Sequence, residues 1–270
     1  VQGQLAPGED FLVTNPVACF STVRASVGAG SGRVSVFPTH CTKAYTAVRR
    51  TLQFFGVTNR DVRVTITSAI PMGKGMASST ADIVGAVEAT AQALEKSISA
   101  EQISALAISI EPGDGLMYRG MVVYNHRRGQ LLEQLSCAPN MLQLIVDTGG
   151  EVDTIEFNRI PKRYTREELG IQAQALALLR AGIASADPLS IGQAATLSAR
   201  VNQRLLPKAQ FTELVGRAQT FGACGIACAH SGTILSLLFA PENTRGFAQA
   251  QASLSRLDYP VLQTHSITNW

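Results

Sequence analysis

Apolar side chains recur along the chain at two spacings, and these spacings predict its strands and helices. Apolar and polar residues alternate in Val62–Thr67, which predicts a half-buried strand, whereas apolar residues recur at helical spacing in Ala77–Leu94. By the same criteria strands are predicted over residues 17–25, 33–37, 62–67, 121–125, 131–135, 141–147, 225–229, 233–239 and 260–263. Helices are predicted over residues 42–55, 77–94, 100–109, 166–183, 188–203, 210–221 and 244–257.

Capping and turn residues define some of these boundaries. Ser99, with Gln102 three positions later, predicts a capping box at the start of the 100–109 helix. Thr39 or Thr42 is expected to cap the 42–55 helix. The glycine-rich run 28–32 predicts a turn between two strands.

The order of the elements indicates the fold class. Strands and helices come in groups and do not strictly alternate, so the class is α+β with a mostly antiparallel sheet. A change of composition at Asp147–Gly150 predicts two domains, of residues 1–147 and 148–270.

Composition and charge exclude several kinds of function. The chain has 270 residues, of which only 16% are charged, against a typical ~25%, so a long disordered segment is not expected. Its net charge of +3 comes from scattered basic residues, which argues against a nucleic-acid partner. No apolar run is long enough to span a membrane and no signal peptide is visible. Since the chain begins at Val1, we expect that residues upstream have been lost.

The cysteines indicate the compartment. There are five, an odd number dispersed along the chain, which favours a reducing environment and hence the cytoplasm. Cys224 and Cys228 stand close to His230, but no second pair of ligands accompanies them, so we expect buried thiols there and no metal site.

The stretch PMGKGMASST at residues 71–80 is the strongest indication of chemistry. It joins a predicted strand to a predicted helix, and its glycines permit unusual backbone angles or a close approach by a ligand. Unpaired N–H groups and serine hydroxyls at a helix start, together with the positive end of the helix dipole, form a potential phosphate site. A plain strand-to-helix turn with a serine cap is the alternative.

Two familiar phosphate motifs are excluded by spacing. In a Walker loop Gly-Lys precedes Ser or Thr, but here Gly75 follows Lys74. In the dinucleotide fingerprint a third glycine would stand where this chain has Ser78.

The same stretch resembles the second signature of the GHMP kinases, P-x-x-x-G-L-G-S-S-A-A. The chain departs from it at Met76, Ala77 and Thr80. The segment 229–233 (AHSGT) stands where the family has its third, glycine-rich signature, and Asp114 stands where the family often has an aspartate. The first signature is not seen, and Val1-Gln2-Gly3 is taken as its tail.

Further sequence segments point to one group within this family. The segments 75–82, 109–112, 192–198, 206–208 and 229–232 are similar to the L-threonine kinases of cobalamin synthesis and propanediol utilisation. The resemblance implies an N-terminal domain like domain 2 of ribosomal protein S5, with a left-handed βαβ arrangement, and a ferredoxin-like C-terminal domain. It also implies ATP-dependent phosphorylation of the L-threonine hydroxyl, with ATP and Mg²⁺ as cofactors.

The resemblance assigns the nucleotide and metal sites residue by residue. ATP would be held by Pro71, Gly73, Lys74, Gly75, Met76, Ala77, Ser78 and Ser79. Lys74 would contact phosphate or would be a solvated loop residue, and Ser78 would cap the helix or contact phosphate. Ser79 would ligate Mg²⁺ with Glu111 as the carboxylate ligand, since Glu88 lies ~13 Å from Ser79 along the helix axis.

The acceptor side is assigned in the same way. Asp114 would receive or orient the proton of the substrate hydroxyl, or would only form a turn. Substrate contacts are expected from Asp82, Ser21, His230 and Ser231, although a capping or backbone role would also explain Asp82 and the 229–232 turn.

Alternatives of substrate and class remain at this point. The acceptor would be homoserine or another small alcohol, or the chain would be a nucleotide-binding protein without catalysis. A monomer or homodimer is expected, with a small molecule as its partner and with neither nucleic acid nor membrane bound.

Overall fold

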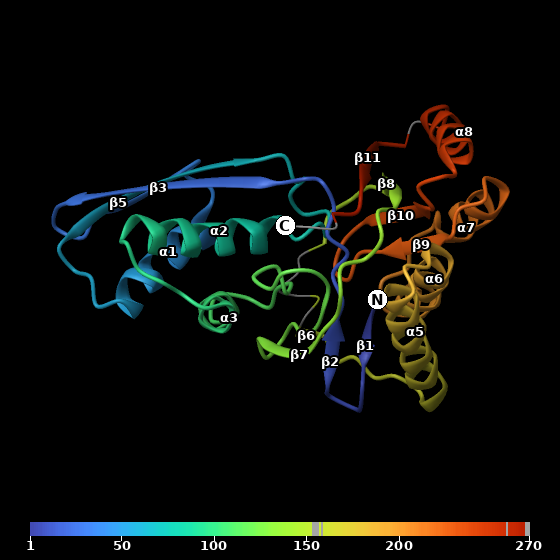
Figure 1. The fold of residues 1–270 in the computed structure, drawn as a ribbon, viewed down its shortest axis with the longest axis horizontal. Helices are drawn as coiled ribbons and strands as arrows, with labels where there is room; N and C mark the ends of the chain where they lie inside the picture. The colour runs from blue at the N-terminus through green and yellow to red at the C-terminus, as the bar shows by residue number, and fades with distance from the viewer. Residues whose placement is uncertain (153–156, 158, 258, 268–270) are drawn as a thin grey trace.

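The fold was taken from a computed structural model, which describes residues 1–152, 157, 159–257 and 259–267. It is elongated, with a helix-covered sheet at either end and a small sheet between them (Figure 1). The strands are β1 Gln2–Gln4, β2 Asp10–Leu12, β3 Ser21–Ala29, β4 Val34–Phe37, β5 Arg60–Ser68, β6 Val122–Asn125, β7 Gln130–Gln134, β8 Leu142–Asp147, β9 Gly225–Cys228, β10 Ile234–Phe239 and β11 Val261–His265. The helices are α1 Thr42–Phe54, α2 Ser78–Ala93, α3 Ala100–Ile108, α5 Arg166–Ala184, α6 Pro188–Leu205, α7 Phe211–Thr220 and α8 Thr244–Ser255.

The first end of the molecule is the sheet β3-β5-β4. Strands β3 and β5 run antiparallel over their full lengths, whereas β4 pairs with β5 in parallel. Their alternating apolar residues, such as Val62, Val64 and Ile66, face a core that they share with α1, α2 and α3. Helix α2, which follows the PMGKGMASST turn, packs against β3 and β5 of the sheet and against α1, which itself contacts β4.

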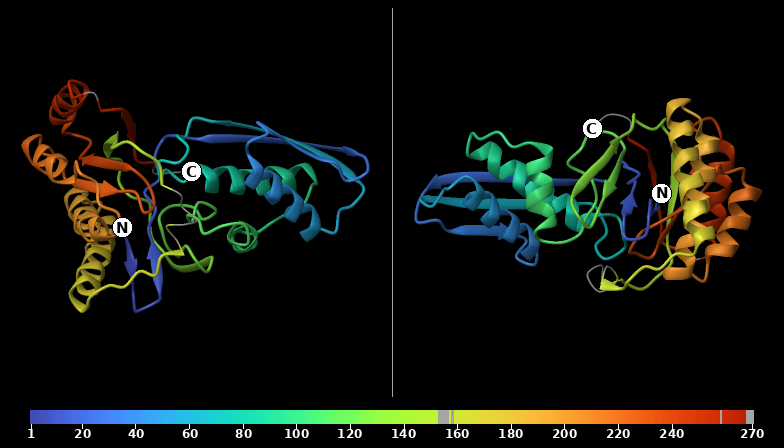
Figure 2. Two further views of the ribbon diagram at one scale, coloured as in Figure 1. Left: turned by 180° about the vertical axis from the view of Figure 1, so that it is seen from behind. Right: turned by 90° about the horizontal axis from the view of Figure 1, so that it is seen from below.

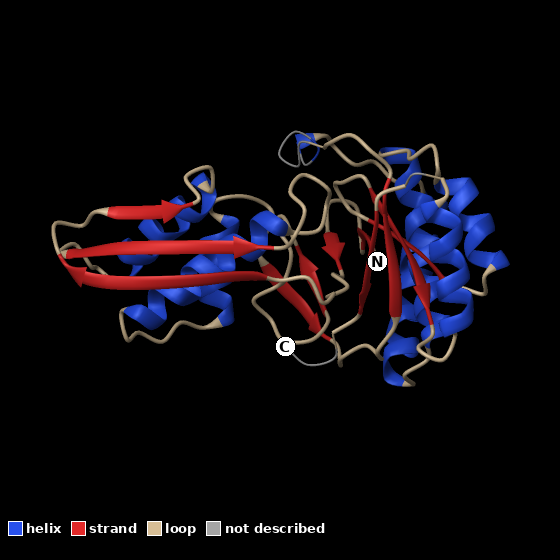
Figure 3. Cartoon of the chain, turned by 90° about the horizontal axis from the view of Figure 1, so that it is seen from above, coloured by secondary structure: helices blue, strands red, loops and turns tan. Residues whose placement is uncertain are grey.

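The opposite end is the antiparallel sheet β11-β8-β10-β9, one face of which is covered by helices (Figure 3). Leu144, Val146, Leu235 and Leu237 point into the core that this sheet forms with α7 and α8. The intervening sheet, β1-β2-β6-β7, lies between the two ends in both views of Figure 2.

A third core joins the middle sheet to the C-terminal helices. Phe11 and Val13, from the β2 region, and Val123 of β6 pack with Leu176 and Leu179 of α5. Since Val122 and Tyr124 of β6 also belong to the core of the first end, buried apolar surface links the two ends of the molecule through the middle sheet.

The elements largely follow the predicted pattern, and the differences have local causes. The capping box of Ser99 and Gln102 is confirmed. Neither threonine caps α1, because its N-cap is Cys41, which makes no side-chain capping bond. Strand β3 starts at Ser21 and extends to Ala29, since Gly28 and Ala29 continue the pairing with β5; Val17, included in the predicted strand, makes only an isolated bridge with Ser266.

Strands β1 and β2 were not predicted. Each has three residues, and their sequences QGQ and DFL carry no alternation long enough to detect. The predicted domain boundary after Asp147 stays a prediction, and β8, which precedes it, is hydrogen-bonded between β10 and β11. Among the described residues, no helix is long and apolar enough to cross a bilayer.

Candidate active site

The PMGKGMASST stretch forms a turn between β5 and α2 that leaves the helix start open. Gly73, Gly75 and Ala77 all have positive φ, at 71°, 84° and 57°. Ala77 is the N-cap of α2 and makes no side-chain capping bond. Ser78 is the first helical residue, so the expectation that it caps α2 is wrong. The first N–H groups of α2 and its positive dipole end meet the requirements of an anion site.

The two predicted signature turns touch each other through glycine. A Cβ atom on Gly75 would lie 2.6 Å from Cβ of Ala229 and 2.8 Å from Cα of Gly232. A Cβ atom on Gly232 would lie 2.2 Å from the carbonyl oxygen of Lys74. The 229–232 turn therefore packs directly against the PMGKGMASST turn, and glycine is required on both sides of the contact.

Ser79 and Glu111, predicted as metal ligands, lie together. The Ser79 hydroxyl donates to Oε1 of Glu111, and Nζ of Lys43 lies 2.6 Å from Oε2 of the same carboxylate. The Glu111 side chain is 5% exposed. Sequence reasoning missed Lys43, which reaches Glu111 from the first turn of α1, because no local pattern links two positions so far apart in the chain.

Asp114 is partly buried and lines the same small cavity as Glu111. Oδ1 of Asp114 accepts a hydrogen bond from the Thr14 hydroxyl at 2.8 Å, and its backbone N–H donates to Thr80 Oγ1 at 3.4 Å. Burial raises the pKa of Asp114, the Thr14 hydrogen bond lowers it, and the charge of Glu111 raises it, with a net rise. A carboxylate with a raised pKa fits a general base. Thr14 was not identified from the sequence.

The surroundings of Asp114 place it beside α2. Thr80, Glu111, Asp114 and Tyr124 line one small cavity. Burial is the main cause that raises the pKa of Tyr124 to about 12, so its hydroxyl stays protonated near neutral pH. The structure therefore brings the metal-ligand candidates and the catalytic candidate into one site.

Asp82 and Ser21 form a separate pair. The Ser21 hydroxyl donates to Oδ1 of Asp82 at 2.6 Å. Burial raises the pKa of Asp82 more than this hydrogen bond and His40 lower it. Asp82 faces β3, whereas Ser79 faces Glu111. Within the described ranges, neither Asp82 nor Ser21 makes a hydrogen bond to Asp114.

His230 faces a buried polar cluster. Its Nδ1 lies 2.5 Å from Oε1 of Gln2, and its Nε2 lies 2.8 Å from Nζ of Lys162. Burial, followed by the nearby His126 and Lys162, holds the pKa of His230 well below its ordinary value. A neutral imidazole that donates to Gln2 and accepts from Lys162 satisfies this geometry. Ser231 lies in the same turn, next to Gly232.

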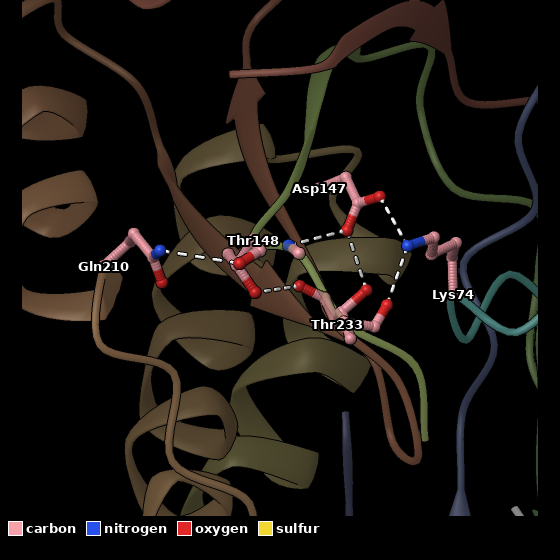
Figure 4. Close-up of polar contacts among 7 residues, drawn as sticks. Lys74, Asp147, Thr148, Gln210 and Thr233 are labelled. Carbon is pink, nitrogen blue, oxygen red and sulfur yellow. Dashed lines mark hydrogen bonds and ion pairs between the residues drawn. The ribbon is translucent and has the colours of Figure 1, made fainter. Parts of the chain in front are cut away.

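Lys74 extends toward the C-terminal sheet. Its ammonium lies 2.9 Å from Oδ2 of Asp147 and donates to the carbonyl oxygen of Gly150 at 2.7 Å (Figure 4). The sequence had indicated Asp147 as the end of a strand and of the first domain, and its contact with Lys74 was not predicted.

The residues present suit Mg²⁺ held mainly by nucleotide. The Ser79 hydroxyl and the Glu111 carboxylate offer oxygen ligands side by side. The described part of the chain contains no group of three or more His, Cys, Asp or Glu residues placed to hold a metal. Magnesium commonly takes one or two protein oxygens and completes its shell with phosphates and water.

Comparisons with known proteins identify the family to which the chain belongs. Residues 40–118, which span the helix-start turn and Asp114, match the model of the GHMP kinases N terminal domain. An L-threonine kinase of Citrobacter freundii is 32% identical over 247 residues, covering 88% of this chain and 82% of the relative. An L-threonine kinase of Salmonella typhimurium is 32% identical over 245 residues, covering 88% and 78%.

Solved structures show the same fold. A homoserine kinase from Cytophaga hutchinsonii superposes with a TM-score of 0.71 at 20% identity, covering 92% of this chain and 85% of that one. An L. major mevalonate kinase in complex with R-mevalonate superposes with a TM-score of 0.72 at 13% identity, covering 95% and 89%. The fold is thus that of these two kinases, and the sequence relatives show that the chain is a phosphotransferase that acts on a hydroxyl group. The chain belongs to the GHMP kinases.

Proposed function

We propose that the chain transfers the γ-phosphoryl group of ATP to the side-chain hydroxyl of L-threonine, giving O-phospho-L-threonine and ADP. The observation that carries the proposal is the convergence of an open helix start, the Ser79–Glu111 pair and Asp114 in one site. The likeness to two L-threonine kinases over most of their lengths favours threonine as the acceptor. A role in cobalamin synthesis is proposed from the resemblance of the segments 75–82, 109–112, 192–198, 206–208 and 229–232.

Each residue has a role that follows from its position. The backbone N–H groups at the start of α2 bind phosphate oxygens and orient the γ-phosphoryl group. Asp114 accepts the proton of the threonine hydroxyl as that oxygen bonds to phosphorus and ADP leaves. Ser79 and Glu111 would hold Mg²⁺ together with the nucleotide, and the bound ion would neutralise part of the negative charge of the phosphates. Asp82, Ser21 and the 229–232 turn are proposed to contact the acceptor.

A second acceptor remains in the proposal because of the fold. The superposed homoserine kinase has the same architecture, so homoserine is the competing substrate. Homoserine carries a primary hydroxyl one carbon further from the amino group than the threonine hydroxyl. The two acceptors therefore place their oxygens differently against Asp114.

A coupled assay of ADP release with Mg·ATP tests the proposal. L-Threonine, L-serine, L-homoserine and mevalonate are compared at equal concentrations, and the product is identified by mass spectrometry. Turnover that is fastest with threonine and gives phosphothreonine is the expected result. Faster turnover with homoserine would show that homoserine, and not threonine, is the acceptor. ATP binding without phosphorylation of any of the four compounds would refute the proposed activity.

A further inference from the structure

The carbonyl and the ammonium of Lys74 both bind residues at the ends of strands in the C-terminal sheet β11-β8-β10-β9. The backbone N–H of Thr233 donates to the Lys74 carbonyl at 3.1 Å, while the Lys74 ammonium lies 2.9 Å from Oδ2 of Asp147. These bonds cross from the phosphate-binding turn to β8 and to the start of β10. They hold the turn at a residue that stands between its two positive-φ glycines, Gly73 and Gly75.

Asp147 is itself held in place by neighbouring donors. Its Oδ1 accepts from the Thr233 hydroxyl at 2.8 Å and from the backbone N–H of Gly149 at 3.0 Å. The Thr148 hydroxyl donates to the Thr233 carbonyl at 2.5 Å, which ties β8 to β10 at the same point (Figure 4). Although burial raises the pKa of Asp147, the hydrogen bond from Lys74 and the other donors give a net lowering, so the carboxylate is ionised near neutral pH.

We propose that Lys74, Asp147 and Thr233 form a clasp that fixes the phosphate-binding turn against the C-terminal half, so that Lys74 is a positioning residue and not a phosphate ligand. The inference rests on the proposed nucleotide site but assigns Lys74 a different role in it. The Lys74 and Asp147 side chains are each 22% exposed, so their attraction is only partly screened by solvent. Two of the three N–H donors of the ammonium are used on Asp147 and on the Gly150 carbonyl, and these contacts direct the side chain toward the C-terminal sheet.

The substitution Asp147→Asn separates the two roles by the sign of its effect on ATP affinity. Asparagine keeps an oxygen for Thr233 and Gly149 but loses the charge that holds Lys74. If Lys74 belongs to the clasp, Asp147→Asn and Lys74→Gln both weaken ATP binding, because the turn is no longer held in place. If Lys74 binds phosphate directly, Asp147→Asn frees the ammonium, and ATP binding is unchanged or tighter while Lys74→Gln weakens it.

The experiment uses the whole chain with Lys74→Gln, Asp147→Asn, the double variant and Lys74→Arg. Glu133→Gln is the matched control, since it removes one negative charge from the Arg180–Glu133 ion pair between β7 and α5. ATP affinity is measured by calorimetry, and kcat and KM are measured by steady-state assay. Amide hydrogen exchange of residues 71–77 is followed in the absence of nucleotide.

The clasp predicts that each neutralising substitution raises the Kd for ATP about fivefold. The double variant is no weaker than either single variant, because both remove the same contact. Exchange at residues 71–77 accelerates in these variants, Lys74→Arg retains most of the wild-type affinity, and the KM for ATP rises more than kcat falls. Glu133→Gln leaves all of these values unchanged.

Two results would overturn the clasp. One is an unchanged or lower Kd for ATP in Asp147→Asn together with a raised Kd in Lys74→Gln, and the other is unaltered exchange at residues 71–77 in both variants. If the wild-type chain itself fails to bind ATP, the proposed function fails, and the exchange measurement alone still decides whether the clasp exists.

Discussion

Asp114 combines a raised pKa with a hydrogen bond that opposes the rise. Burial and the charge of Glu111 favour the protonated carboxyl group, whereas the Thr14 hydroxyl favours the carboxylate. A general base works only when it is deprotonated, so activity should rise with pH through the pKa of Asp114. Thr14 therefore adjusts the pH range in which the proposed base is active.

Removal of the Thr14 hydroxyl is expected to shift that range. In Thr14→Val the pKa of Asp114 rises further, and the acidic limb of the kcat/KM profile for the acceptor moves to higher pH. Thr14→Ser keeps the hydroxyl and is the control, with a limb close to that of the wild type. A Thr14→Val profile that coincides with the wild-type profile would show that Asp114 does not set the acidic limb.

The Ser79–Glu111 pair predicts a dependence on magnesium. Ser79→Ala and Glu111→Gln each remove an oxygen ligand or its charge, so the Mg²⁺ concentration at half-maximal activity should rise about tenfold or more. Glu88→Gln is the matched control, because Glu88 is an exposed residue on the same helix as Ser79. A Mg²⁺ titration of initial rates checks this, and equal shifts in all three variants would contradict the assignment.

The two turns that meet at Gly75 show how an element is fixed by contacts far apart in the chain. Gly75 needs both its positive φ and its missing side chain, since Ala229 and Gly232 lie against it. The sequence indicated the helix start and its glycines from local pattern alone. It could not indicate that the second turn packs on the first, or that Thr14 reaches Asp114, because such contacts depend on the tertiary fold.

Gly75→Ala and Gly8→Ala separate backbone strain from lost space. Both glycines have a φ of 84°, but an added Cβ at Gly8 would meet nothing within 4 Å. Gly8→Ala should lower the free energy of unfolding by about 1 kcal/mol through strain alone. Gly75→Ala should cost a further ~1–3 kcal/mol from overpacking and should also weaken ATP binding. Urea unfolding with ATP calorimetry checks both, and equal losses of stability in the two variants would contradict the close packing of the turns.

At the scale of the molecule, the core shared by the middle sheet and the C-terminal helices couples the two ends. Helices and longer strands followed from their periodicity, and the α+β class followed from the order of these elements. In the middle sheet β6 and β7 were predicted, whereas β1 and β2 were not, because they are too short to show a period and gain their stability from pairing and from packing on α5. The coupling between the halves was therefore outside the reach of local sequence patterns.

Phe11 tests that coupling. It is fully buried in the shared core, so Phe11→Ala should lower the free energy of unfolding by about 3–5 kcal/mol. Because this core joins the middle sheet to the C-terminal helices, the loss should appear as one unfolding transition with its midpoint at a lower urea concentration. Phe20→Ala, at a side chain that is 56% exposed, should change stability by no more than ~0.5 kcal/mol. Two separate transitions in Phe11→Ala would show that the halves unfold independently.

The most direct test of the account is the rate of phosphothreonine formation from Mg·ATP and L-threonine, measured side by side for the wild type and Asp114→Asn. The account predicts turnover by the wild type and a loss of about 10²–10⁴-fold in the variant, with ATP binding retained. A wild type that binds ATP but forms no phosphothreonine, or a variant as active as the wild type, would contradict it.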